Sequence, residues 1–247
     1  FSGFPLSRTI LIRMMMNPAL THNRFTWLLL IIPMALLVTG MLYISHTGIF
    51  FLRCVDPEYA YLFNGLLLAQ FKPDVQFITN PGIPVQCLVA LVSGIMHLFR
   101  PGQPLITDVL QNPEVYIRAT LYTMNVINVT AIYFLGYYAW RCSGRLAVSL
   151  FLQLTPAAHL LTLEVMARMM PEALMTAIVC CWLIILVNIL YRDEQVINSG
   201  RYSLIFGALF AISLADKLTF MPFFVLPLFV LSGWRNKLKY ALYSLVF

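Results

Sequence analysis

The chain has 247 residues, of which 60% are hydrophobic and only 11% are charged. A soluble domain carries roughly 25% charged residues, so this composition excludes a soluble globule, and it equally excludes disorder, coiled coil and collagen. The remaining class is an all-α, polytopic transmembrane helical protein. The net charge of +6 comes from basic residues scattered between apolar runs, with no Lys/Arg-rich run, so we expect no nucleic-acid partner.

Several apolar runs approach the length of about 20 residues that crosses a bilayer. We expect spans at about 26–46, 119–140, 146–163, 171–191, 202–215 and 219–234, with the start of another at 240. The last run is cut off and the chain begins with Phe1. We therefore expect residues 1–247 to be a single transmembrane module that is incomplete at its C-terminus.

The run 83–99 is ambiguous, because it has 17 residues and includes Gln86, Ser93 and His97. If it does not cross and the N-terminus is cytoplasmic, ten basic residues lie inside and six outside. If it crosses, the numbers become seven and nine. The positive-inside rule therefore favours a non-spanning or re-entrant helix here.

Residues 47–117 then form one long outer loop, and eight of the ten acidic residues lie on the outer side. We expect short interfacial helices in this loop. One is predicted over 57–71, with Asp56 as N-cap and Pro57 at the first helical position. Its apolar stripe is Tyr59, Leu62, Phe63 and Leu66.

Asp56 and Glu58 stand just outside the first span. Two carboxylates at the membrane surface suit a general base with a second, orienting acid. The alternative is structural: Asp56 caps the helix and Glu58 complements its dipole.

Basic residues follow at the outer ends of later spans. Arg118 opens the second span, where it either binds a phosphate or extends to the headgroups. Arg168 lies between the third and fourth spans and suits a lipid phosphate; its alternative is an ion pair with Glu164 or Glu172.

Asp216 and Lys217 lie between two short spans, close to hydrocarbon, where charged residues usually have a function. The alternative is that they pair with each other. Asn80 begins a turn, NPGIP, that precedes the ambiguous run. No metal-ligand spacing or nucleotide loop occurs, so we expect neither a metal nor another cofactor.

The order of these motifs resembles the GT-C glycosyltransferases, in the branch of protein mannosyltransferases and lipid A aminoarabinose transferases. The matching segments are DPEYAYLFNGL (56–66), NPGIP (80–84), YIRATLY (116–122), WRCSGR (140–145), RMMPEALM (168–175) and FGALFAISLADKLTF (206–220). They span about 50–247 and correspond to the N-terminal part of such an enzyme. Two positions depart: Asn80 replaces the family's usual His, and Pro57 separates two acids that are often adjacent.

The resemblance implies a GT-C-like fold and a sugar transfer from a polyprenyl- or dolichyl-phosphate donor to an acceptor hydroxyl at the outer face, with inversion. Asp56 is then the general base and Glu58 the second catalytic acid. The residues implied in substrate binding are Tyr59, Asn80, Arg118, Arg168, Glu172 and Lys217. The implied partners are the lipid-linked sugar, membrane lipid and an acceptor that the sequence does not identify.

Two other functions fit the composition. A transporter or flippase of lipid-linked saccharides places polar groups at mid-membrane, and the spans contain Asn125, Asn128, Gln153, His159 and Asn188. The second of these functions is that of a non-catalytic membrane scaffold. In each case we expect a multi-pass protein of the bacterial inner membrane, or of the endoplasmic reticulum in a eukaryote, with a cytoplasmic N-terminus.

Overall fold

The computed structural model describes residues 26–50, 58–72, 82–100, 102–158, 164–166, 168–191 and 200–246. Within these ranges the regular structure is helical and contains no strand, which confirms the all-α prediction. The elements are η1 (Thr26–Leu30), α2 (Ile31–His46), α3 (Glu58–Ala69), α4 (Ile83–Leu98), α5 (Leu105–Gln111), α6 (Pro113–Ser143), α7 (Leu146–Leu154), η3 (Thr155–Ala158), α9 (Pro171–Leu190), α11 (Gly200–Asp216), η4 (Leu218–Phe224), α12 (Val225–Val230) and α13 (Trp234–Val246).

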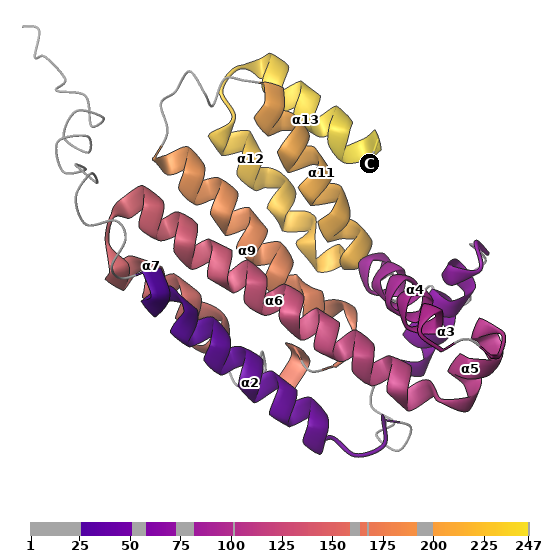
Figure 1. The fold of residues 1–247 in the computed structure, drawn as a ribbon. Helices are drawn as coiled ribbons and strands as arrows, with labels where there is room; N and C mark the ends of the chain where they lie inside the picture. Colours follow the sequence, from indigo (N-terminus) through magenta and orange to yellow (C-terminus); the bar gives the residue numbers. More distant parts are fainter. Residues whose placement is uncertain are drawn as a thin grey trace, which may run out of the picture.

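The longer helices form a bundle around α6, and the short helices gather at one end of it (Figure 1). The 31-residue α6 packs against α2, α7 and α9, and α9 continues the bundle to α11, which packs on α13. The helices α3, α4 and α5 lie together at the end where α2 stops and α6 begins (Figure 1). The segment between the first and second expected spans therefore covers one end of the bundle.

Two described helical segments are both long and apolar enough to cross a membrane: Thr26–His46, which is η1 with α2, and Pro171–Leu190, which is α9. They coincide with the expected spans 26–46 and 171–191. The run 83–99 forms the 16-residue α4, and 219–234 is divided between η4 and α12.

The first of these segments leaves most of its apolar surface uncovered. Ile31, Met34, Val38 and Leu42 form one stripe along α2, and each is about half exposed. Such a stripe is costly in water and is suited to lipid. The exposed side of α2 therefore has the composition of a lipid-facing surface.

Asn128 of α6 joins this central helix to α9. Its Nδ2 donates to the carbonyl oxygen of Ala173 at 2.7 Å, and its Oδ1 accepts from the backbone N–H of Ala177 at 3.1 Å. Ala173 and Ala177 stand four residues apart, so one amide side chain contacts both ends of a helical turn. The fully buried Asn128 thus fixes the register of α9 against α6.

Two further amides join α6 to its other neighbours at glycine positions. Asn125 donates to Leu37 O at 3.1 Å, beside Gly40, where a Cβ would lie 2.5 Å from its Nδ2. Gln153 of α7 donates to Leu29 O at 3.0 Å and lies over Gly136 of α6. The close approach at both glycines lets a polar side chain reach a backbone carbonyl of another helix.

The helix α7 is shorter than the expected span 146–163. It ends at Leu154 because Pro156 has no N–H to donate to Leu152 O, and the hydroxyl of Thr155 donates to that oxygen instead at 2.7 Å. The 3-10 turn η3 follows. The expected span 146–163 is therefore interrupted after Leu154, and residues 159–163 lie outside the described part of the chain.

We predict that Asn128→Leu lowers the stability of the folded protein by about 1–2 kcal/mol, because it removes two buried interhelical hydrogen bonds. Thermal unfolding in a mild detergent measures this change. The matched control is Asn188→Leu, since among the described residues Asn188 bonds only to Ile184 O of its own helix. Equal losses in the two variants would contradict the assignment of Asn128 as the bond between α6 and α9.

Candidate functional site

The expected site residues that the structure describes lie on the elements at the α3–α5 end of the bundle. Glu58 and Tyr59 begin α3, Arg118 stands in the second turn of α6, and Glu172 in the first turn of α9. Lys217 directly follows α11. Asp56 and Asn80 fall outside the described residues, but Asp56 is two residues before Glu58 in the chain.

Tyr59 is bound to Glu114 at the start of α6. Its hydroxyl donates to Glu114 Oε1 at 2.8 Å, and Glu114 Oε2 accepts from the backbone N–H of Phe50 at 3.3 Å. Burial and the neighbouring carboxylate raise the pKa of Tyr59 to about 12, so the hydroxyl remains protonated. Glu114 was not among the expected site residues, and it holds the start of α3 to α6.

Arg118 closes the C-terminal end of α2. Its two terminal nitrogens donate to Ile44 O and Thr47 O at 2.7 Å each, and one also reaches Gly48 O at 3.2 Å. The guanidinium lies over the Phe50 ring, 5.4 Å from its centroid. A helix end leaves its last carbonyls without partners, and a cation is favoured there. The geometry gives Arg118 a structural role, and its binding of substrate stays a prediction.

Glu172 and Lys217 form an ion pair that joins α9 to the end of α11. Both side chains are only about one quarter exposed, at 28% and 25%. The sequence alternatives paired Arg168 with Glu172 and Lys217 with Asp216. In the structure Glu172 and Lys217 instead pair with each other, which their spacing in the sequence does not indicate. The pair leaves an ammonium and a carboxylate at the bundle end, partly accessible to solvent.

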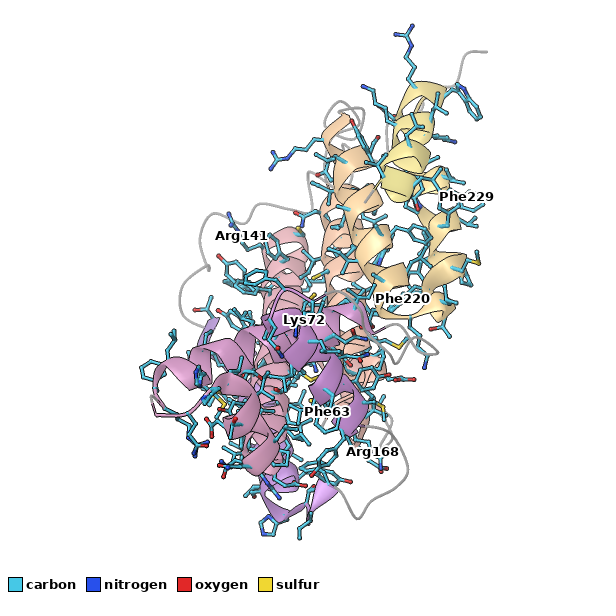
Figure 2. All side chains as sticks on the ribbon, turned by 90° about the vertical axis from the view of Figure 1, so that its right-hand side faces the viewer. Phe63, Lys72, Arg141, Arg168, Phe220 and Phe229 are labelled. Carbon is cyan, nitrogen blue, oxygen red and sulfur yellow. The ribbon has the colours of Figure 1, made fainter. Side chains whose placement is uncertain are left out.

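Arg168 lies in the segment that leads into α9. The next two residues, Met169 and Met170, are buried in the core cluster that also contains Tyr61 and Leu62 of α3. The Nε of Arg168 is buried and has no hydrogen-bond partner among the described residues. In Figure 2, Arg168 lies below Phe63 of α3, and both lie well below Arg141. The guanidinium of Arg168 therefore keeps one buried N–H without a partner in the described part of the chain.

Asp216 ends α11 and is fully buried. Its backbone oxygen accepts from Gly82 N at 3.1 Å, while both of its carboxyl oxygens lack a hydrogen-bond partner in the described part of the chain. Burial raises the pKa of Asp216 to about 8. A buried acid that is neutral at neutral pH is unusual outside functional sites.

Gly82 connects these elements. It has a φ of +48°, which a side chain rarely adopts, and a Cβ there would lie 2.8 Å from both Tyr61 and Pro171. Together with the bond to Asp216, this close contact holds α3, the start of α4, the start of α9 and the end of α11 at one point. Gly82 of the NPGIP motif thus has a packing role at the entry to α4.

A second polar cluster holds α5 to α6. Asp108 accepts from Tyr116 Oη at 2.5 Å and from Asn112 at 3.1 Å, and it pairs with Arg100 at 3.3 Å. The Tyr116 hydrogen bond holds the pKa of Asp108 below its usual value. All three partners lie within residues 100–116, so the cluster fixes α5 against the start of α6.

An apolar cavity of about 580 Å³ runs from the ion pair along α9. Six of its lining residues lie on one face of that helix, and the others come from α6, α7, η3 and residue 165. The lining is Leu135, Leu152, Thr155, Pro156, Val165, Glu172, Met175, Thr176, Val179, Cys180 and Leu183. Glu172 is the one charged residue among the described residues that line it.

The described residues contain no group of three or more His, Cys, Asp or Glu side chains able to hold a metal ion. No protein-family model, curated protein or solved structure matches the chain. The resemblance to the GT-C enzymes therefore depends on the sequence motifs alone.

We predict that Arg118→Met lowers the stability by at least about 2 kcal/mol, because charge-assisted hydrogen bonds at the end of α2 are lost. Thermal unfolding in detergent measures the loss. Arg141→Met is the matched control on the same helix, since Arg141 contacts the Tyr137 ring at 5.8 Å. Unchanged stability in Arg118→Met together with lost lipid-phosphate binding would contradict the structural role.

We predict that Asp216→Asn is more stable than the wild type at neutral pH. The folded-state pKa of about 8 exceeds the ordinary value of 3.8, so the wild type becomes progressively less stable as pH rises between these values. Asparagine cannot ionise, so the advantage of the variant grows over this window and is absent below it. Melting temperatures from pH 4 to pH 8 measure it, with the exposed Glu164→Gln as control. A difference in melting temperature between Asp216→Asn and the wild type that does not change with pH would contradict the raised pKa of Asp216.

Proposed function

We propose that this chain is part of an integral, multi-pass membrane glycosyltransferase of the GT-C kind. It transfers a sugar from a polyprenyl- or dolichyl-phosphate donor to an acceptor hydroxyl at the outer face of the membrane. The N-terminus is cytoplasmic, and the membrane is the bacterial inner membrane or, in a eukaryote, that of the endoplasmic reticulum.

One observation carries the proposal: charged residues far apart in the sequence stand at one end of an apolar bundle. Glu58 lies at the start of α3, Glu172 pairs with Lys217 across α9 and α11, and Arg168 precedes α9. In a chain with 11% charged residues, such a concentration at one end supports a site at the membrane surface. The lipid-facing stripe of α2 supports the membrane location.

The chemistry follows from the residue types at this end. Asp56 takes the proton of the acceptor hydroxyl, whose oxygen attacks the anomeric carbon of the sugar. The bond between that carbon and the phosphate oxygen breaks, the lipid phosphate leaves with the electron pair, and the configuration inverts. Arg168 and Lys217 stabilise the charge that develops on the phosphate. Glu58 is the second acid. It stands at the first residue of α3, two residues after Asp56 in the sequence.

A flippase is less consistent with the contacts of the polar residues within the bundle. Asn125, Asn128 and Gln153 donate their amide hydrogens to backbone carbonyls of neighbouring helices. These bonds hold helices together. Groups that bind a moving saccharide would instead have to be free to exchange partners during transport.

The central prediction is that Asp56→Asn in the full-length protein abolishes sugar transfer, because an amide cannot accept the proton of the acceptor. The assay follows transfer of label from radiolabelled polyprenyl-phosphate sugars by the purified protein. The expected loss is at least about 100-fold, the contribution typical of a general base.

Asp74→Asn is the control, since it removes another carboxylate from the same outer segment. It should retain activity, and both variants should express and unfold like the wild type. Full activity in Asp56→Asn would contradict the assignment of Asp56 as the general base. Absence of transfer by the wild type with every polyprenyl-phosphate sugar would contradict the proposed activity itself.

A further inference from the structure

The charged residues that the structure describes differ between the two ends of the bundle. Both signs occur at the α3–α5 end, as in the Glu172–Lys217 pair. Figure 1 shows the start of α13 at the opposite end, where α6 ends and α7 and α11 begin. Every described charged residue at that end is basic: Arg141, Arg145, Arg201, Arg235, Lys237 and Lys239. Three of these six belong to the first two turns of α13.

One face of α13 is fixed against α11 and η4. Tyr240 is fully buried, its ring stacks on that of Phe224 with the centroids 5.1 Å apart, and its hydroxyl donates to Phe224 O at 3.0 Å. The hydroxyl of Ser203 on α11 donates to Asn236 O at 2.8 Å. Because these contacts fix the rotation of α13 about its axis, they determine which of its side chains face outward.

The outward face of α13 carries an apolar stripe. Trp234 is 76% exposed, and the stripe continues through Leu238, Leu242 and Leu245, each about half exposed or more. These residues recur three or four positions apart, which places them on one side of the helix. The stripe is costly in water, and it begins with an aromatic residue of the kind enriched where a membrane meets water. It therefore suits the acyl region of a leaflet, with Trp234 at the level of the headgroups.

Cations flank the stripe on both sides where it begins. Arg235 and Lys239 stand four residues apart on one side of it, and Lys237 stands on the other. None of the three forms an ion pair within the described part of the chain, and the first turn of α13 contains no acidic residue. Three like charges close to a helix N-terminus repel one another and oppose the helix dipole. An external anion beside them therefore lowers the free energy of this arrangement.

We propose that the first two turns of α13 bind the head of an anionic phospholipid in the cytoplasmic leaflet. Arg235 and Lys239 contact its phosphate, and its acyl chains lie along Leu238 and Leu242. A lipid with a choline head is disfavoured, because its own cation meets the three basic side chains. The inference rests on the membrane location and orientation in the proposed function, and it requires neither sugar transfer nor the residues at the α3–α5 end.

The test uses Trp234 as a reporter in the full-length protein. The protein is reconstituted in bilayers of equal parts phosphatidylglycerol and phosphatidylcholine, in which one lipid or the other carries bromine atoms that quench tryptophan fluorescence. The quenching due to Trp234 is the difference between the wild type and Trp234→Phe. We expect phosphatidylglycerol to be favoured beside Trp234 about fivefold, the effect of about one cation at a membrane surface.

The double variant Arg235→Gln/Lys239→Gln removes the two cations on one side of the stripe, so the preference for phosphatidylglycerol should disappear. The matched control is Lys72→Gln/Arg145→Gln, which removes two exposed cations outside α13 and should keep the preference. A measurement on the wild type covers the case in which the double variant fails to fold. Raising the salt to about 1 M, where the Debye length falls to about 3 Å, should weaken the preference.

Each outcome decides the proposal. A preference for phosphatidylglycerol that is lost in the α13 variant and kept in the control supports it. Equal quenching by the two lipids in the wild type, or a preference that the α13 variant or salt leaves unchanged, would overturn it. Loss of the preference in the control as well would assign it to the net charge of the protein, and would overturn it too.

The same measurement separates this proposal from the proposed activity and from another kind of partner. Quenching of Trp234 by neither lipid would place the start of α13 outside the bilayer and overturn the proposal in favour of a soluble acidic partner. Asp56→Asn should abolish sugar transfer and leave the lipid preference intact. Failure of the proposed activity and failure of the lipid site are therefore distinguishable.

Discussion

The fold depends on the pair of hydrogen bonds between Asn128 of α6 and one turn of α9. In an apolar interior a polar side chain cannot exchange its partner for water, so this contact fixes both the distance between the helices and their relative position along the axis. Ala173, which accepts one of the bonds, directly follows Glu172. The position of the ion pair at the end of the bundle is therefore set by an amide within the bundle.

The same helix positions the other components of the site. Near its start, Glu114 holds Tyr59 and therefore α3, and Arg118 holds the last carbonyls of α2. These contacts are less than two turns apart on α6, so the ends of α2 and α3 are fixed against a common surface. Glu58 therefore begins a helix whose first turn is hydrogen-bonded to α6.

Part of this organisation follows from the sequence because it depends on local pattern. The apolar helical segments Thr26–His46 and Pro171–Leu190 follow from apolar length, and Pro171 stands at the start of the second of them. The end of α7 was missed because apolar composition continues through 163, whereas Pro156 interrupts the backbone bonding. Prolines 222 and 227 similarly divide the run 219–234 between η4 and α12.

The partners of the charged residues could not be predicted, because they depend on which helices become neighbours. Spacing pairs Lys217 with Asp216 and Arg168 with Glu164 or Glu172, all close in sequence. The bundle instead brings Glu172 to Lys217 from 45 positions away (217 − 172) and leaves Asp216 in an apolar setting. Nearness in sequence is a weak guide where the end of one helix meets the start of another.

The contrast between the adjacent residues Asp216 and Lys217 determines the charge at this end of the bundle. Because burial favours the protonated form of Asp216, this acid does not neutralise the neighbouring ammonium. Among the described residues Lys217 is then paired with Glu172, and Arg168 adds a positive charge four residues before Glu172 in the chain. The three ionised groups have a net charge of +1, so this end of the bundle favours an anionic partner over a cationic one.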